Sequence, residues 1–207
     1  MSDFLKRTWA EIDLDAIRHN FQVIEASLAP GSRAMAVVKA DAYGHGAGYV
    51  SRALQEAGAS WFGVSNLDEA MQIRNAGIVE PILILAYTPP EEAARLAAFS
   101  VSQAVLTREY AVRLSEEAVR AGVRVRVHVK IDTGMSRVGL FYQEAGRDDG
   151  IIDEVEAIVR LPGLEPEGIF THFASADEED EDGDAYTRRQ FTLFMDAVEK
   201  LERRGIR

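Results

Sequence analysis

The sequence contains no cysteine, so it forms no disulfide bond and offers no thiolate ligand to a metal ion. A chain without cysteine fits a reducing compartment, and we expect a cytoplasmic protein. The sequence also lacks any apolar run close to the roughly 20 residues of a membrane span, and its N-terminus has no signal-peptide core. We therefore expect no association with a membrane.

Basic residues are too few and too scattered for a nucleic-acid surface. Acidic residues outnumber basic residues by 34 to 23, which gives a net charge of −11. The acidic run Asp177–Asp184 lacks the ligand spacing and the distal glutamate of a calcium loop, so we predict a solvated loop there and no metal site. These features favour a small-molecule partner.

Short apolar runs alternate with helical patterns along the chain. Trp9–Leu14 alternates like a strand, and apolar residues at helical spacing follow Asp15, which we expect to cap the helix. Six further candidate strands begin near positions 34, 61, 81, 103, 123 and 167. Asn66 and Glu69 form the start of a helix that Gly77 closes. This order predicts an α/β fold with a parallel sheet, either an open doubly wound sheet or a (β/α) barrel.

The segment Val123–Asp132 favours the barrel. Its apolar residues fall on one face of the predicted strand, and the opposite face carries Arg126, His128, Lys130 and Asp132. An open parallel sheet covered by helices on both faces would be apolar on both. Polar residues inside a barrel, near the carboxyl ends of its strands, are where such enzymes place their chemistry.

A second feature is the stretch AVVKADAYGHGA (residues 36–47), in which an apolar strand runs into Lys39 and then into a turn. Gly44 and Gly46 permit that tight turn. Lys39 at a strand end would extend to solvent, or its amine, partly desolvated at the mouth of an apolar barrel, would form a Schiff base. Spacing and composition leave both interpretations open.

The string VVKADAYGHG closely resembles the pyridoxal-phosphate attachment motif of alanine racemases. WAEIDLDAIRHNF, VHVKIDTGMSRVGL and THFASADE resemble further segments of the same family. The resemblance implies a fold-type III enzyme, a homodimer in which a (β/α)8 barrel carries pyridoxal phosphate and a C-terminal β-domain completes the partner's site. It also implies interconversion of L- and D-alanine, which supplies D-alanine for peptidoglycan. Whether the substrate is alanine alone or includes other small amino acids stays open.

The resemblance also implies roles for single residues. Lys39 is the Schiff-base lysine and one of two acid/base groups, the other being a tyrosine from the partner's C-terminal domain. Tyr43 binds the cofactor phosphate, where the other interpretation is a packed ring. Arg137 lies near the phenolic oxygen of the cofactor and the substrate carboxylate, and His172 lies beside the cofactor. From the residues alone, the arginine would be a surface cation and the histidine a packed core residue.

Lys130 is the remaining residue with an implied role. It is a candidate for carbamylation, which would give an anion able to pair with Arg137. The alternative is an unmodified Lys130 paired with Asp132.

The length of the chain modifies this expectation. A full barrel needs eight strands and about 250 residues, whereas this chain offers six in-barrel strands in 207 residues. We expect residues 1–207 to form an incomplete N-terminal barrel domain without the last two βα units and the C-terminal β-domain, weak or inactive alone. Two alternatives are a single-domain pyridoxal-phosphate barrel of cofactor homeostasis, whose lysine motif differs, and a non-catalytic fragment that associates through open sheet edges.

Overall fold

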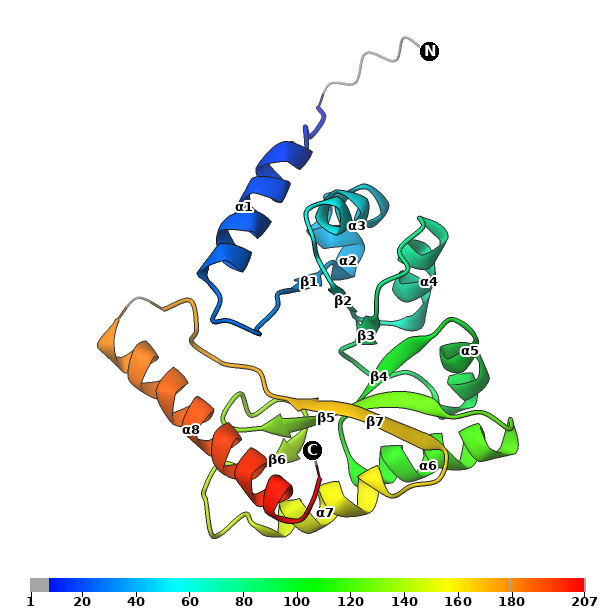
Figure 1. The fold of residues 1–207 in the computed structure, drawn as a ribbon, viewed down its shortest axis with the longest axis vertical. Helices are drawn as coiled ribbons and strands as arrows, with labels where there is room; N and C mark the ends of the chain where they lie inside the picture. Colours follow the sequence, from blue (N-terminus) through cyan, green and yellow to red (C-terminus); the bar gives the residue numbers. More distant parts are fainter. Residues whose placement is uncertain (1–7, 179, 207) are drawn as a thin grey trace. The chain divides into compact units, whose positions relative to one another are not determined.

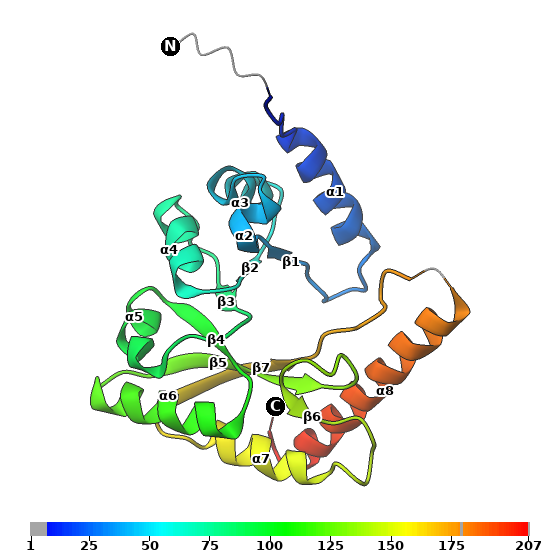
Figure 2. The same ribbon diagram turned by 180° about the vertical axis from the view of Figure 1, so that it is seen from behind.

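The computed structural model describes residues 8–178 and 180–206. The chain divides into two compact units (Figures 1 and 2). The first unit contains the residues up to 64 together with 68–81, and the second contains 65–67 together with the residues from 82 onward. Among the helices of the described residues, none is both long and apolar enough to cross a membrane.

The first unit begins with helix α1 (Leu14–Ser27), and its start differs from the prediction. Asp13, not Asp15, caps the helix, because its carboxylate accepts hydrogen bonds from the N–H groups of Asp15 at 2.9 Å and Ala16 at 3.0 Å. The predicted strand Trp9–Leu14 is wrong: residues 8–13 form no strand, and Leu14 already belongs to the helix. Trp9 is 67% exposed, so its alternation with polar neighbours did not report burial.

The rest of the first unit is a βα arrangement. Strand β1 (Met35–Val37) pairs in parallel with β2 (Trp61–Val64). Between them lie α2 (Lys39–Tyr43) and α3 (Ala47–Glu56), and α4 (Leu67–Asn75) begins directly after Asn66, as predicted. The described core of this unit includes Phe62, Val64, Ala70 and Ile73, all with fully buried side chains.

The second unit contains a parallel sheet built around β5 (Val125–Asp132). β3 (Ile82–Ile84) pairs with β4 (Val101–Val105), β4 pairs with β5, and β7 (Leu164–Phe170) also pairs with β5. These strands and the two of the first unit confirm the six predicted after the first helix. The sequence did not reveal β6 (Leu140–Phe141), which pairs with the carboxyl end of β5, because two residues show no periodicity.

Helices line the sheet of the second unit in chain order. A short 3-10 turn, η1 (Pro90–Glu92), leads into α5 (Ala93–Ala98), and α6 (Arg108–Arg120), α7 (Gly150–Val159) and α8 (Glu181–Arg203) follow. Successive helices from α5 to α8 contact one another (Figure 1). The apolar face of β5 is fully buried, and it consists of Val125, Val127, Val129 and Ile131.

The opposite face of β5 is polar, as predicted. Arg126 and His128 lie near the Glu167 carboxylate of β7, at 3.6 Å and 3.4 Å respectively. Ser102 of β4 donates a short hydrogen bond to the same carboxylate. Burial lowers the pKa of His128, although the charge of Glu167 opposes that shift. The sheet therefore carries a partly exposed polar cluster on this face.

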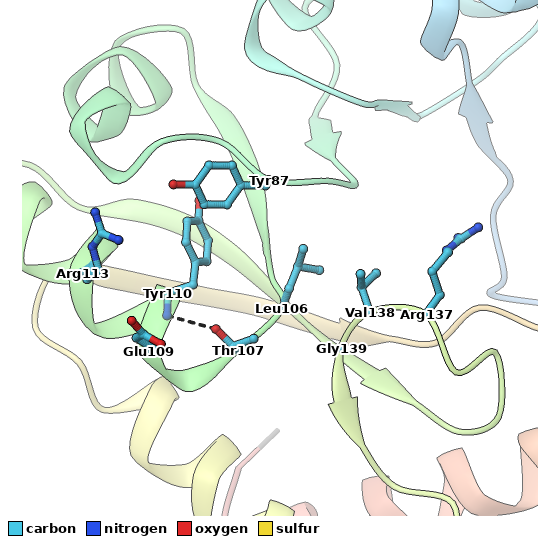
Figure 3. A pocket seen from close by; sticks show the side chains of 9 residues that line it. All are labelled: Tyr87, Leu106, Thr107, Glu109, Tyr110, Arg113, Arg137, Val138 and Gly139. Carbon is cyan, nitrogen blue, oxygen red and sulfur yellow. Dashed lines mark hydrogen bonds between the residues drawn. The ribbon is translucent and has the colours of Figure 1, made fainter.

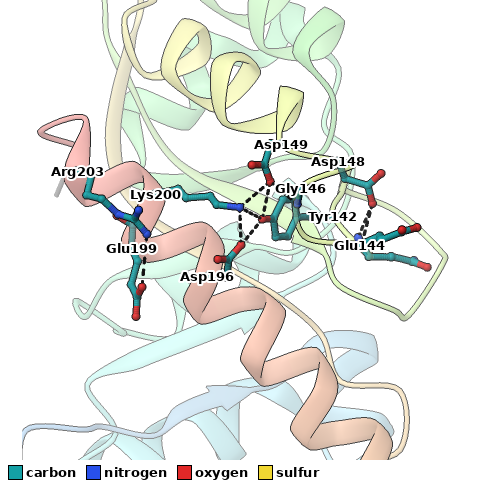
Figure 4. A network of polar contacts seen from close by, with 10 residues as sticks. Tyr142, Glu144, Gly146, Asp148, Asp149, Asp196, Glu199, Lys200 and Arg203 are labelled. Atoms are coloured by element: carbon teal, nitrogen blue, oxygen red, sulfur yellow. Dashed lines mark hydrogen bonds and ion pairs between the residues drawn. The ribbon is translucent and has the colours of Figure 1, made fainter.

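A second polar network attaches α8 to the end of β6 and the start of α7 (Figure 4). The Lys200 amine donates to the Tyr142 hydroxyl at 2.8 Å and to Asp149 at 2.6 Å, and it lies 2.8 Å from Asp196. The hydrogen bond from Lys200 is the main cause that lowers the pKa of Asp149 to about 2. Burial and the hydrogen bond to Asp196 raise the pKa of Tyr142 to about 12.

The acidic run before α8 is only partly a loop. Asp180 caps α8 by accepting a hydrogen bond from the N–H of Gly183 at 2.7 Å, and Glu181–Asp184 form its first turn. The loop prediction is therefore wrong from Glu181 onward, while Glu179 lies outside the described residues. Acidic side chains stabilise this first turn, because the N-terminal end of a helix carries partial positive charge.

Candidate functional site

The segment Lys39–Tyr43 is a left-handed turn at the carboxyl end of β1. Its last four residues have φ of 51°, 54°, 53° and 57°, and none of them is glycine. Residues with a Cβ atom pay roughly 1–2 kcal/mol each for this conformation. Within the segment, the N–H of Ala42 donates to the carbonyl of Val38 at 2.9 Å, and that of Gly46 donates to Asp41 at 2.9 Å. The sequence indicated a tight turn but gave no sign of its handedness.

Lys39 and Tyr43 are neighbours across this turn. Lys39 is half-buried, and its amine lies 6.0 Å from the centre of the Tyr43 ring. The tyrosine is 60% exposed, so the interpretation of a packed ring is wrong. Gly44 and Gly46 have φ of 85° and 88°, which confirms their predicted role in the turn. The turn thus presents an amine and a phenol hydroxyl together.

Two carboxylates hold the left-handed turn against neighbouring helices of the first unit. Glu69 of α4 accepts a hydrogen bond from the N–H of Ala40 at 3.0 Å. Asp41 accepts hydrogen bonds from the N–H of Ala47, the first residue of α3, at 2.7 Å and from the Gln72 amide at 3.2 Å. This role of Asp41 and Glu69 leaves no local pattern in the sequence, because the contacts join residues up to 31 positions apart.

Arg137 lies in the second unit, on the loop between β5 and β6. Asp132, the last residue of β5, accepts hydrogen bonds from the N–H groups of Gly134 at 3.0 Å, Ser136 at 2.9 Å and Arg137 at 2.9 Å. Burial alone would raise the pKa of Asp132, but these bonds and one from Gln143 outweigh it and lower the pKa. An ionised Asp132 therefore fixes the backbone that carries Arg137.

Lys130 lies on the same strand and is only 3% exposed. Burial is the main cause that lowers the pKa of its amine, and the nearby charge of Arg137 lowers it further, while Asp132 acts in the opposite direction. Among the described residues, Lys130 makes no ion pair with Asp132, whose oxygens bind the loop amides instead. The structure thus brings Lys130 and Arg137 into one electrostatic environment.

His172 follows β7 by two residues and is exposed, so the interpretation of a packed core histidine is wrong. Its carbonyl accepts a hydrogen bond from the Gln190 amide of α8 at 3.1 Å. Thr171, beside it, shares a 2.8 Å hydrogen bond with Thr133, which follows β5. The strand ends that carry Arg137 and His172 are therefore linked within the second unit.

A cavity of about 490 Å³ opens beside the Arg137 loop (Figure 3). Arg137 and Val138 lie at one end of its lining, and Tyr87, Tyr110 and Arg113 lie at the other. The two tyrosine rings are 5.3 Å apart. Burial raises the pKa of Tyr110 above its ordinary value. Of these lining residues the sequence indicated Arg137 alone; Tyr110, for example, lies in the amphipathic helix α6, where a tyrosine has the same pattern as any core residue.

Comparison with known proteins identifies one family over nearly the whole chain. The family profile "Alanine racemase, N-terminal domain" matches residues 12–207. Alanine racemase 2 of Caldanaerobacter subterraneus subsp. tengcongensis is 42% identical over 207 residues, which are 100% of this chain and 51% of that protein. The alanine racemase of Desulforamulus reducens is 43% identical over 198 residues, 96% of this chain and 51% of its own length.

Solved structures agree with these sequence matches. The alanine racemase of Clostridium difficile 630 superposes with a TM-score of 0.87 at 35% identity, over 99% of this chain and 52% of that one. The chain therefore spans about half the length of the relatives that it matches.

Proposed function

Because the chain belongs to the alanine racemase family, we propose that it forms the pyridoxal-phosphate-binding part of an enzyme that interconverts L- and D-alanine. The observation that carries the proposal is the turn Lys39–Tyr43, in which the Lys39 amine lies 6.0 Å from the centre of the Tyr43 ring. In this proposal residues 1–207 supply the N-terminal barrel domain, the enzyme is a cytoplasmic homodimer, and its D-alanine serves peptidoglycan.

The side chains of the turn fit the cofactor chemically. A lysine amine is the nucleophile that an aldehyde requires, and a phenol hydroxyl is a donor for a phosphate oxygen. The planar guanidinium of Arg137 suits a phenolate or carboxylate oxygen. Pyridoxal phosphate, when bound, supplies the electron sink that stabilises negative charge at the Cα of an amino acid. The chain itself binds, orients and moves protons.

In this proposal Lys39 acts on one face of the substrate Cα, where its Nζ takes or returns a proton. Racemisation requires a second acid/base group on the opposite face, and we assign that role to a tyrosine of a partner subunit. Arg137 holds the substrate carboxylate, so that the Cα–H bond points toward the acting group. His172 lies beside the cofactor in the same proposal, supported by its place directly after β7.

Lys130 is proposed as a carbamylation site. Its lowered pKa leaves more of the amine neutral, and a neutral amine adds to carbon dioxide to give a carbamate with release of one proton. The product is an anion beside Arg137, which replaces the repulsion between two cations by attraction. Mass analysis of the intact chain under bicarbonate would show an added 44 Da, about the mass of one carbon dioxide, and Lys130→Ala would remove it.

The experiment that tests the proposed function maps which lysine reacts with pyridoxal phosphate, and the chain has few lysines to distinguish. The sequence contains Lys6, Lys39, Lys130 and Lys200. The chain is mixed with pyridoxal phosphate and reduced with borohydride, and its peptides are mapped. We expect the label on Lys39 and no label there in Lys39→Ala. A label spread equally over all lysines, or none on the folded chain, would contradict the proposal for this chain.

Racemase activity is measured separately, as exchange of the α-hydrogen of alanine with deuterated solvent. In the whole enzyme we expect exchange that is lost in Lys39→Ala and weakened in Arg137→Ala, whereas residues 1–207 alone should show weak exchange or none. Retention of full exchange in Lys39→Ala would exclude the assigned acid/base role.

A further inference from the structure

The left-handed turn needs support from outside its own backbone. Its four residues of positive φ all carry a Cβ atom, which disfavours four successive residues in this conformation. The support comes from α3 and α4, which both follow the turn in the chain. Glu69 and Gln72 lie three residues apart and therefore on one face of α4, and they reach Ala40 and Asp41.

Asp41 has the central position in this support. One oxygen of its carboxylate accepts both the N–H of Ala47 in α3 and the amide of Gln72 in α4. Gly46, which precedes α3, has no side chain to cap that helix, so Asp41 caps it from six residues upstream. Asp41 thus fastens the middle of the turn to two helices.

We propose that Asp41 is a positioning residue that sets the direction of the Lys39 amine and the Tyr43 hydroxyl by holding the turn in its left-handed form. The inference rests on the proposed function, in which these two groups bind the cofactor. Asp41 acts through the backbone between them. Without its bonds, the residues from Ala40 onward return toward the right-handed region, and the side chains at the ends of the turn point in new directions.

A purely structural role for Asp41 as a helix cap is the alternative, and Asp13 provides a matched control for it. Asp13 caps α1 in the same unit through two backbone hydrogen bonds and lies outside the turn. Asp13→Ala should lower stability as a lost cap does, without changing Lys39. Asp41→Asn keeps an acceptor oxygen and serves as the conservative variant.

The experiment measures Lys39 in the wild-type chain and in Asp41→Ala, Asp41→Asn and Asp13→Ala. Competitive labelling with acetic anhydride gives the reactivity of Lys39 relative to Lys200. Hydrogen exchange reports the turn through the N–H of Gly46. In Asp41→Ala we expect the reactivity of Lys39 relative to Lys200 to change at least about threefold. We expect hydrogen exchange at the Gly46 N–H to become about tenfold faster, because the turn opens more often without the Asp41 bonds. Borohydride-trapped labelling of Lys39 by pyridoxal phosphate should fall by about 10-fold or more, since small misplacements cost up to about 100-fold.

Each outcome decides the question. The inference holds when Asp41→Ala alone changes Lys39, while Asp41→Asn stays near the wild type. It is overturned when Asp41→Ala leaves the relative reactivity of Lys39 unchanged, or when Asp13→Ala changes it equally. If the wild-type chain takes no pyridoxal-phosphate label, the proposed function fails for this chain, and the acetic anhydride result still decides the role of Asp41.

Discussion

Replacing Asp132 by alanine should loosen the loop that carries Arg137 and destabilise the second unit. The carboxylate accepts three backbone hydrogen bonds, of 2.9 to 3.0 Å, from Gly134, Ser136 and Arg137. At about 1 kcal/mol net for each bond, the loss is about 3 kcal/mol. This is a large share of the roughly 5–15 kcal/mol that stabilises a typical domain.

Asp132→Asn should cost less. It keeps one acceptor oxygen, but its NH2 group replaces the other oxygen and faces a backbone donor, so we expect a loss of about 1–2 kcal/mol. Asp148 is a suitable control, because its carboxylate accepts two hydrogen bonds, from the N–H groups of Gln143 and Glu144, both at 2.9 Å, in an adjacent loop. Asp148→Ala removes two such bonds, so it should cost about 2 kcal/mol at the same value per bond and leave the Arg137 loop unchanged.

Urea unfolding gives the free energies for this series, and hydrogen exchange at Ser136 and Arg137 reports the loop itself. The folded-state pKa of Asp132 is below its ordinary value of 3.8. The stabilisation by its ionised form is therefore present above pH 3.8 and is lost as the pH falls through the lower folded value. An Asp132→Ala chain with unchanged unfolding free energy and unchanged exchange at neutral pH would refute the reasoning.

Three further changes test other parts of the structure. Gly163→Ala would place a Cβ atom in steric overlap with the Ser115 carbonyl oxygen, so we expect about 2 kcal/mol or more of destabilisation; an unchanged urea midpoint would contradict this. The lowered pKa of the partly buried His128 means that its contribution to stability is present above pH 6.5 and decreases below it. Thermal unfolding of His128→Gln should therefore show a smaller loss of stability than the wild type as the pH falls below 6.5. An identical pH profile in both chains would exclude His128 as the cause of that loss. In Lys200→Met, NMR titration should find the pKa of Asp149 raised from about 2 toward 3.8, because its main hydrogen-bond donor is gone; a value that stays near 2 would show that other donors dominate.

The sequence by itself determined six strands, all of those in the described residues except β6, and their order along the chain. Each apolar run from Ala34 onward became a strand, because burial of alternating or continuous apolar residues leaves a periodic pattern that the chain carries locally. The motif around Lys39 likewise indicated the family, since ten neighbouring residues suffice to identify it. Where the pattern did not reflect burial, as at Trp9, the predicted strand was wrong.

Only the tertiary structure decided how the candidate site residues are held. The left-handed conformation of Ala40–Tyr43 contains no glycine that would predict it from the sequence. It depends on Glu69, which lies 29 residues after Ala40 in the chain. The role of Asp132 likewise depends on the path of the loop that follows it. Hydrogen bonds between distant residues leave no period in a sequence, because they depend on where the chain returns in space.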